Sequence, residues 1–322
     1  MYIVTGGAGF IGSAFVAKLN EQGIRDILVV DELGATHKWK NLQGKLFTDY
    51  IHKDTFIKQI DSGLKLPKVD GIIHMGACSS TTEMNVDFLM ENNYRYTVSL
   101  ASYALQNKVR FIYASSAATY GEGANGYSDD AETTKILKPL NPYGFSKQVF
   151  DLSVILSGLE SKAAGLKFFN VYGPNEEHKG DMRSMVLKAF EQIKGAGTVK
   201  LFKSYKPDYK DGEQKRDFVY IKDCAAVMYW LLTNPKVNGI FNLGTGKARS
   251  WNDLANAAFA ALGKPPSIEY IDMPAELRDQ YQYFTEAKME KLKAMGCPVA
   301  FSSLEEGVKD YITNYLEKNR TL

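Results

Sequence analysis

Residues 1–12 read MYIVTGGAGFIG, a short apolar segment that runs directly into glycines at positions 6, 9 and 12. A helical pattern begins at Ser13, so the stretch predicts a strand, a tight turn and a helix. Glycines at this spacing let the turn close, let the backbone approach a pyrophosphate and let the helix pack on the strand. The helix N-terminus offers free N–H groups and a partial positive charge to that pyrophosphate. The stretch therefore predicts dinucleotide binding.

An acidic residue closes the next apolar segment, Ile27–Val30. Asp31 lies nineteen residues after Gly12, about where a carboxylate would reach an adenosine ribose. A glycine triplet alone is weak support, because flexible loops are also rich in glycine. The strand before it, the helix after it and the acid beyond it together favour a dinucleotide site.

Bulk composition excludes several classes of protein. The 322 residues leave room for about two domains, and 45% hydrophobic with 24% charged residues is typical of a globular chain. A net charge of +2 favours neither a nucleic-acid binder nor an acidic tail. No apolar run reaches the length of a membrane span. We expect neither nucleic acid nor a membrane as a partner.

The cysteines and histidines show no metal-ligand spacing, so no metal site is expected. The three cysteines are an odd number, which suits a reducing cytosol. Met1 begins the first strand and leaves no room for a signal peptide, so the cytoplasm is the expected location. These residues are Cys78, Cys224 and Cys297, with His37, His52, His74 and His178.

Strand-like and helix-like patterns alternate along the first half of the chain. This alternation predicts an α/β fold, a doubly wound parallel sheet of the Rossmann type with helices on both faces. The strand-like runs are 2–4, 27–30, 69–75, 109–114 and 166–171. Residues 218–221 and 239–243 are predicted to return to the same sheet, and helical periodicity covers 88–105 and 145–156. The apolar faces of these two helices also predict a homo-oligomer.

The predicted dinucleotide-binding domain comprises residues 1–173 and 216–246. Residues 174–215 and 247–322 are expected to form a smaller α/β substrate-binding lobe. The substrate cleft should lie between the two, at the carboxyl ends of the strands.

Residues 141–147 read NPYGFSK and predict the start of a helix, with Asn141 as its cap and proline in its first turn. Tyr143 and Lys147 then lie one turn apart on the same face. A phenol ordinarily keeps its proton to about pH 10, and a nearby ammonium and an oxidised nicotinamide ring both favour the phenolate. With 19 tyrosines in the chain, the spacing alone proves nothing.

Hydroxyl side chains follow the strand at 109–114, where residues 115–121 read SSAATYG. At a strand's carboxyl end they would point into the cleft and could bond a sugar oxygen as it becomes a carbonyl. A turn or a helix cap is an equally good interpretation of this segment.

With these motifs the chain resembles the extended short-chain dehydrogenase/reductase family, whose members act on nucleotide sugars. The resemblance runs nearly end to end and includes FFNVYGP at 168–174, RDFVY at 216–220 and FNLGTG at 241–246. It implies that Ser116 and Tyr143 contact the oxidised hydroxyl and that Lys147 holds the nicotinamide ribose. It further implies that Asn170 contacts the substrate and that Arg216 grips its diphosphate.

Several stretches are similar to one subgroup, the ADP-glyceromanno-heptose 6-epimerases of lipopolysaccharide synthesis. They are 76–83, 91–94, 114–121, 178–180, 281 and 284–285. The resemblance implies oxidation of the heptose at C6 and return of the hydride to the opposite face. That chemistry needs an acid/base group on each side of C6. Tyr143 supplies one, and Lys179 matches the second, although without the family it is a loop lysine of the kind usually solvated.

The same resemblance assigns residues to the ligands. The implied ADP-heptose site comprises Asn170, Asp181, Lys188, Phe202, Lys203, Ser204, Tyr205, Arg216 and Tyr281. Phe202 and Tyr281 would fit an aromatic core equally well, and the stretch 203–215 is longer than the subgroup leads us to expect. The implied cofactor contacts are Gly6, Gly9, Phe10, Ile11, Gly12, Asp31, Glu32, Lys38, Lys53, Met75, Gly76, Ala77, Cys78, Ser79, Asn92, Lys147 and Val171.

The resemblance implies NADP as the cofactor, with Lys38 and Lys53 offsetting the negative charge beside a 2′-phosphate. An acid at position 31 ordinarily favours NAD, and Glu32 adds a second charge, so NAD is the alternative. Met75 stands where the subgroup commonly has an acid, and Phe145 where it frequently has a tyrosine.

Other activities of the family fit less well. A 4,6-dehydratase needs an acid and a base beside Ser116, where this chain has Ala117 and Ala118. A UDP-hexose 4-epimerase turns the keto-sugar over and needs no second base, so Lys179 discriminates against it. A cofactor-sensing regulator typically lacks the tyrosine or the lysine, and both are present. A simple reductase would consume reduced cofactor, which an epimerase does not.

Overall fold

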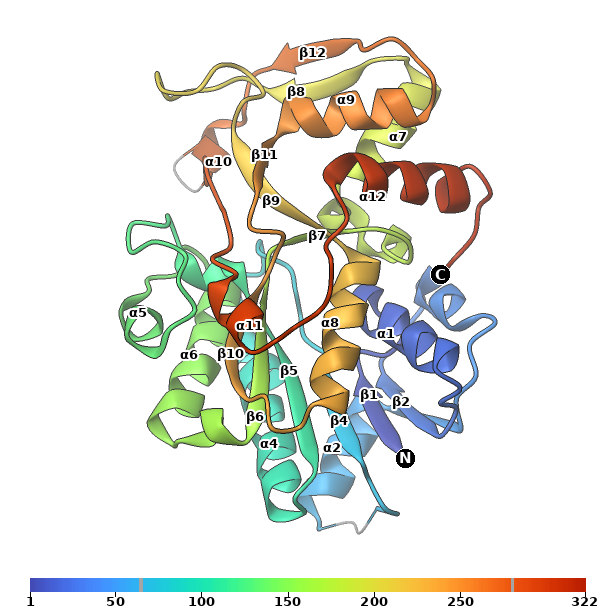
Figure 1. Cartoon of the computed structure of the whole chain (residues 1–322), viewed down its shortest axis with the longest axis vertical. Coiled ribbons are helices and arrows are strands. Elements are labelled where there is room, and N and C mark those ends of the chain that lie inside the picture. The colour runs from blue at the N-terminus through green and yellow to red at the C-terminus, as the bar shows by residue number, and fades with distance from the viewer. Residues whose placement is uncertain (64–65, 279–280) are drawn as a thin grey trace.

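A seven-stranded parallel sheet forms the centre of the computed structural model, which describes residues 1–63, 66–278 and 281–322 (Figure 1). The strand order is β10-β6-β5-β4-β1-β2-β3, so the chain reverses direction across the sheet between β1 and β4. The strands are β1 (Tyr2–Thr5), β2 (Ile27–Asp31), β3 (Asp49–His52), β4 (Gly71–His74), β5 (Arg110–Ser116), β6 (Ala163–Phe168) and β10 (Gly239–Leu243). The predicted doubly wound fold is confirmed.

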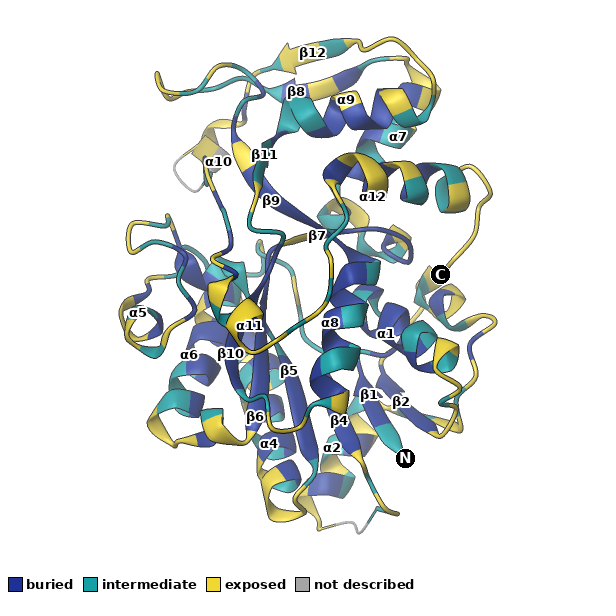
Figure 2. Ribbon diagram, viewed as in Figure 1, coloured by how far each residue is buried: buried dark blue, intermediate teal, exposed yellow. Residues whose placement is uncertain are grey.

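Helices cover both faces of this sheet, and alternate strand residues face each layer. Val4 and Val29 pack toward α1 (Phe10–Glu21) and α8 (Ile221–Thr233). Their neighbours Ile3 and Leu28 pack toward the opposite layer. That layer contains α2 (Lys53–Asp61), α4 (Tyr96–Gln106) and α6 (Pro142–Leu156). Because both faces are covered, most strand residues are buried, as Figure 2 shows.

The sequence interpretation of strands needs two corrections. Residues 218–221 do not return to the main sheet, because β6 already pairs with β10 on that side. Instead β9 (Lys215–Tyr220) pairs in parallel with β7 (Asn170–Tyr172) and antiparallel with β11 (Ala248–Ser250). The second correction is β3, whose short polar sequence, with no buried residue, carries no strand pattern. The prediction for 239–243 is confirmed by β10.

The substrate-binding lobe predicted at 174–215 and 247–322 contains a two-stranded sheet and several helices; its limits stay a prediction. Its parallel strands are β8 (Val199–Phe202) and β12 (Ile268–Ile271). Its helices are α7 (Met185–Gly195), α9 (Trp251–Ala261), α10 (Ala275–Arg278) and α12 (Leu304–Tyr311), which packs on α9. Within the predicted range, α11 (Glu290–Ala294) instead packs against β10 of the main sheet (Figure 1).

Short helices and single helical turns complete the fold. They are η1 (His37–Leu42), α3 (Val86–Leu89), η2 (Met90–Arg95), η3 (Ala117–Tyr120), α5 (Ala131–Ile136), η4 (Leu159–Ser161), η5 (Glu177–Met182) and η6 (Ile312–Leu316). The helix predicted at 88–105 is interrupted by the π-helical turn η2. Such turns often occur at functional sites, and here Asn93 of η2 donates to the Cys78 carbonyl at 3.0 Å. No helix in the described ranges has the length and apolarity required to span a membrane.

A fully buried ion pair supports the end of β5. The Asp151 carboxylate on α6 accepts from Lys167 Nζ at 2.7 Å and from Ser115 Oγ at 2.6 Å. Lys167 Nζ also donates to Thr119 Oγ1 at 2.8 Å. Since Ser115 and Thr119 flank Ser116, this pair holds the strand end on both sides of that residue.

We expect Asp151→Ala to destabilise the protein by about 3–5 kcal/mol, because it leaves the Lys167 charge buried without a partner. Urea unfolding followed by fluorescence measures the change. Adding Lys167→Met should restore part of the loss, since no isolated charge then remains. Glu132→Ala, which breaks an exposed pair with Lys135, is the matched control and should change stability little. Equal effects of the two single variants would contradict the role given to the buried pair.

Candidate active site

The glycine-rich turn between β1 and α1 is packed too closely for side chains. A Cβ at Gly12 would lie 2.0 Å from the Gly6 carbonyl oxygen, and a Cβ at Gly6 would lie 2.6 Å from the Gly76 nitrogen. Gly6 also has a φ of +63°, in the left-handed region. The structure therefore gives the backbone approach that a pyrophosphate site requires, and the predicted dinucleotide turn fits.

Asp31, at the end of β2, is buried and tied to this turn. One carboxylate oxygen accepts from the Ala8 N–H at 2.8 Å, and the other accepts from the Glu32 N–H at 2.6 Å. Lys38 pairs with the same carboxylate, and Lys53 Nζ lies 3.5 Å from the Glu32 carboxylate. Each acid predicted beside the ribose thus has a lysine partner.

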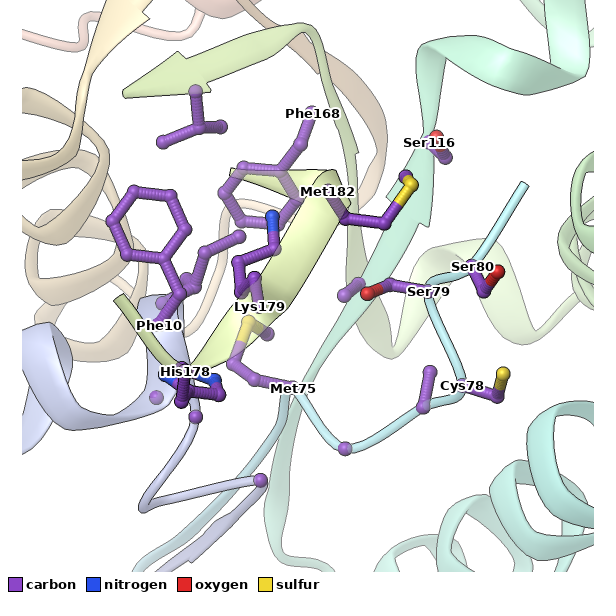
Figure 3. Close-up of a pocket in the computed structure, with 18 of the residues that line it drawn as sticks. Phe10, Met75, Cys78, Ser79, Ser80, Ser116, Phe168, His178, Lys179 and Met182 are labelled. Atoms are coloured by element: carbon purple, nitrogen blue, oxygen red, sulfur yellow. The ribbon is translucent and has the colours of Figure 1, made fainter. Parts of the chain in front are cut away.

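A cavity of about 820 Å³ opens at the carboxyl ends of the parallel strands (Figure 3). It is lined by every residue predicted to contact the cofactor and by the four predicted catalytic residues. Asn170 is the one predicted substrate residue among the residues that line it. The topology therefore brings together positions that are spread along the chain between Gly6 and Lys179.

Helix α6 presents Tyr143 and Lys147 to this cavity. Asn141 caps the helix by accepting from the Gly144 N–H at 2.8 Å, as predicted. Lys147 Nζ donates to the Ala114 carbonyl at 2.8 Å, which directs its ammonium toward the end of β5. Ser116 Oγ accepts from the Ala118 N–H at 3.1 Å, which confirms the cap. The residue also lines the cavity, and its contact with a sugar oxygen stays a prediction.

Burial dominates the electrostatics of this pair. It raises the pKa of Tyr143 above its ordinary value, while a hydrogen bond with Ser116 acts in the opposite direction. It lowers the pKa of Lys147 to about 8, while the Asp151 carboxylate acts to raise it. In the protein without its cofactor the pKa of Tyr143 is thus not lowered, and the shift expected beside an oxidised nicotinamide ring stays a prediction. Removing the phenolate from water costs more than the Ser116 hydrogen bond offsets.

Lys179 is half-buried in the cavity, unlike an ordinary loop lysine. Its Nζ lies 5.2 Å from the centre of the Phe10 ring, and burial lowers its pKa despite the opposing Glu176 carboxylate. In Figure 3, Lys179 and Phe10 lie to one side of the pocket and Ser116 to the other. A lysine with a lowered pKa at a cavity wall can exchange a proton with a bound molecule.

Arg216 lies beside the cavity in an aromatic cluster. Its guanidinium is 5.1 Å from the Tyr281 ring centre and 5.7 Å from that of Trp251. Trp251 Nε1 donates to the Tyr281 hydroxyl at 2.8 Å, and Trp251 lines the cavity. Among the described residues no carboxylate lies within 4.0 Å of this buried guanidinium. The cluster thus keeps a cation available for an anion.

The other predicted substrate residues lie outside the cavity wall. Lys188 Nζ donates to the Asp181 carbonyl at 2.7 Å. Lys203 and Tyr205 both bond the Asp272 carboxylate, at 3.2 and 3.0 Å. The ring centres of Phe202 and Tyr281 lie 6.4 Å apart. Ser204 Oγ donates to the Lys206 carbonyl at 3.0 Å.

Several residues that line the cavity were not predicted as site residues from the sequence. His178 and Phe168 lie in segments already singled out, at 178–180 and 168–174, so proximity to those motifs was a usable signal. Met182 and Trp251 had none, because η5 and α9 bring them in from the second lobe. Within the described part of the chain, no three acidic, histidine or cysteine side chains gather as metal ligands would.

We expect dinucleotide binding to weaken as the pH rises through about 8, where Lys147 loses its charge in the ligand-free protein. Burial lowers this pKa, so the positive charge that faces an anionic ligand disappears earlier than for an exposed lysine. Fluorescence titrations at pH values on either side of this point measure the change. Lys147→Met should abolish the step, and an unchanged step in that variant would assign it to another group.

The chain is similar to known proteins over nearly its whole length. Residues 2–244 match the model of the NAD dependent epimerase/dehydratase family. The chain is 59% identical over 316 residues to an ADP-L-glycero-D-manno-heptose-6-epimerase of Nitratidesulfovibrio vulgaris (strain DP4), with 98% of each chain covered.

Two solved structures extend the comparison. The Helicobacter pylori ADP-L-glycero-D-manno-heptose-6-epimerase has a TM-score of 0.81 and 30% identity, covering 97% of this chain and 95% of that one. The Thermotoga maritima UDP-glucose 4-epimerase, solved with UDP-glucose, has a TM-score of 0.79 and 27% identity, covering 99% of both chains. The resemblance found from the motifs is confirmed, and a nicotinamide cofactor fits the glycine-rich turn. The chain belongs to the NAD dependent epimerase/dehydratase family.

Proposed function

We propose that this protein epimerises an ADP-glycero-manno-heptose at C6. The observation that carries this proposal is the presence of two candidate proton-transfer groups, Tyr143 and Lys179, in one cavity. Similarity to the heptose 6-epimerases supports the substrate, which would place the reaction in the synthesis of lipopolysaccharide core precursors.

Each active-site residue has a distinct task in the proposed reaction. A bound nicotinamide cofactor would supply the reversible hydride transfer at C6 that the inversion requires. Tyr143 exchanges the proton of the C6 oxygen on one face, and Lys179 does so on the other. Ser116 orients that oxygen by hydrogen bonding. Lys147, fixed by the Ala114 carbonyl, holds the ribose and keeps a positive charge near Tyr143.

The diphosphate of the substrate is assigned to Arg216. A buried guanidinium without an acidic partner among the described residues suits a diphosphate, which it can bond through two N–H groups. The aromatic rings of Tyr281 and Trp251 around it exclude water and fix its plane. Asn170, on the cavity wall, contacts the sugar.

The direct test is to incubate the purified protein with ADP-D-glycero-D-manno-heptose, without added cofactor, and follow C6 by proton NMR. Conversion to the L-glycero isomer supports the substrate, the reaction and a retained cofactor together. Tyr143→Phe is the control and should lose nearly all activity while still binding cofactor. No conversion, even with NADP or NAD added, would return the substrate to the UDP-hexoses that similar folds turn over.

We also infer that the cofactor is NADP. The Asp31 carboxylate is already occupied by the Ala8 N–H and by Lys38, so its charge is offset where a 2′-phosphate would lie. Lys53 adds a second cation at the same cavity edge.

Lys53→Met should weaken NADP binding by about tenfold and leave NAD binding nearly unchanged, because the 2′-phosphate is the only difference between the two. Isothermal titration of the apoprotein with each dinucleotide measures this. The control is Lys58→Met, on an exposed position of the same helix. Equal losses for both cofactors would contradict the assignment of Lys53.

A further inference from the structure

Asn41, at the end of η1, joins three segments through one side chain. Its Nδ2 lies 3.0 Å from the Ala8 carbonyl, 3.0 Å from the Asn175 carbonyl and 3.1 Å from His178 Nδ1. The side chain is only 5% exposed and does not line the cavity. An amide NH₂ has two hydrogens, so it can donate to both carbonyls at once.

One end of this network belongs to the cofactor turn. The Ala8 carbonyl accepts from Asn41, and the Ala8 N–H donates to Asp31 at 2.8 Å. Asp31 in turn pairs with Lys38, which lies three residues before Asn41 on the same turn of helix. These contacts close a ring between the glycine-rich turn, the end of β2 and η1.

The other end belongs to the segment that carries Lys179. Asn175 has a φ of +79°, a left-handed conformation that a residue with a side chain keeps only when its surroundings hold it there. Three contacts do so: Asn41 donates to its carbonyl, its own Nδ2 donates to Ser13 Oγ at 2.9 Å, and its Oδ1 accepts from the Leu322 N–H at 2.9 Å. His178, which directly precedes Lys179, places its Nδ1 3.1 Å from the same Asn41 nitrogen.

The imidazole ring of His178 is uncharged in this network. Burial and the charges of Lys38 and Lys179 lower its pKa to about 4, although Asp31 and a backbone hydrogen bond act in the opposite direction. The ring is therefore uncharged at neutral pH and adds no further positive charge beside Lys179.

We propose that Asn41 is a positioning residue, which couples the cofactor turn to the segment 175–179 and so holds Lys179 in place over the cavity. The inference rests on the proposed function, because it concerns the second proton-transfer group. Asn41 touches no reacting atom and acts through Ala8, Asn175 and His178 alone. A misplacement of a reacting group by about 1 Å costs on the order of 10²-fold in rate, so loss of this amide should be visible in turnover.

The test mixes cofactor-loaded protein with each C6 epimer in turn and follows reduced nicotinamide by its absorbance in a stopped-flow instrument. Tyr143→Phe and Lys179→Met first define which epimer depends on which group. Asn41→Ala should slow the Lys179-dependent epimer by about 10²-fold. The other epimer and the affinity for substrate should stay close to those of the unaltered protein. Asn41→Asp, which keeps the shape but removes the donor, should behave in the same way.

The matched control is Asn20→Ala. Asn20 Nδ2 also donates to two backbone carbonyls, those of Ile24 and Leu46, but it lies away from the cavity. Equal slowing of both epimers by Asn41→Ala, slowing of the Tyr143-dependent epimer, or no slowing would each overturn the proposal.

A second measurement does not need turnover. Amide hydrogen exchange of residues 175–182 in the cofactor-loaded protein should become faster in Asn41→Ala and remain unchanged in Asn20→Ala. If neither heptose reacts but exchange still responds, the proposed function fails while the coupling stands. If exchange does not respond, the coupling is wrong whatever the substrate. Should Asn41→Ala not fold, Asn41→Ser gives the same comparison with more of the space filled.

Discussion

The close contact of the glycine-rich turn with the ends of β1 and β4 is the constraint on which the site depends. A Cβ at Gly12 or Gly6 would lie 2.0 or 2.6 Å from backbone atoms, so this turn exists only without side chains. Once it is closed, the Ala8 N–H meets Asp31 and the Ala8 carbonyl meets Asn41. The cofactor turn is thereby connected both to the ribose end and to the loop of Lys179.

Charge is distributed unevenly around the cavity. The acids at the ribose end, Asp31 and Glu32, each have a lysine within 4.0 Å. In the described part of the chain, Lys147, Lys179 and Arg216 have no such acidic partner, and burial lowers the pKa of each. Cations that are desolvated and unpaired interact strongly with phosphates, so this arrangement suits an anionic cofactor and a nucleotide-sugar substrate.

Local patterns predicted those parts of the site that depend on neighbouring residues. The turn at 6–12, the cap at Asn141 and the spacing of Tyr143 with Lys147 are set by backbone geometry within a few residues. The pairing of 218–221 was predicted wrongly. The place beside β6 in the main sheet is taken by β10, and β9 pairs with β7 instead. The strand at 49–52 was not predicted because, with no buried residue, it carries no apolar pattern.

By itself the sequence determined the parallel α/β fold, the dinucleotide turn and the family, because these follow from spacings within single segments. Only the tertiary structure decided the electrostatics and the second side of the site. The pKa of Tyr143 is raised rather than lowered, since burial depends on residues from several segments. Lys179 lines the cavity rather than lying in solvent, and its loop contacts the cofactor turn through Asn41 and Asn175, which are 134 residues apart. Contacts over such distances in the chain have no signature in any one segment.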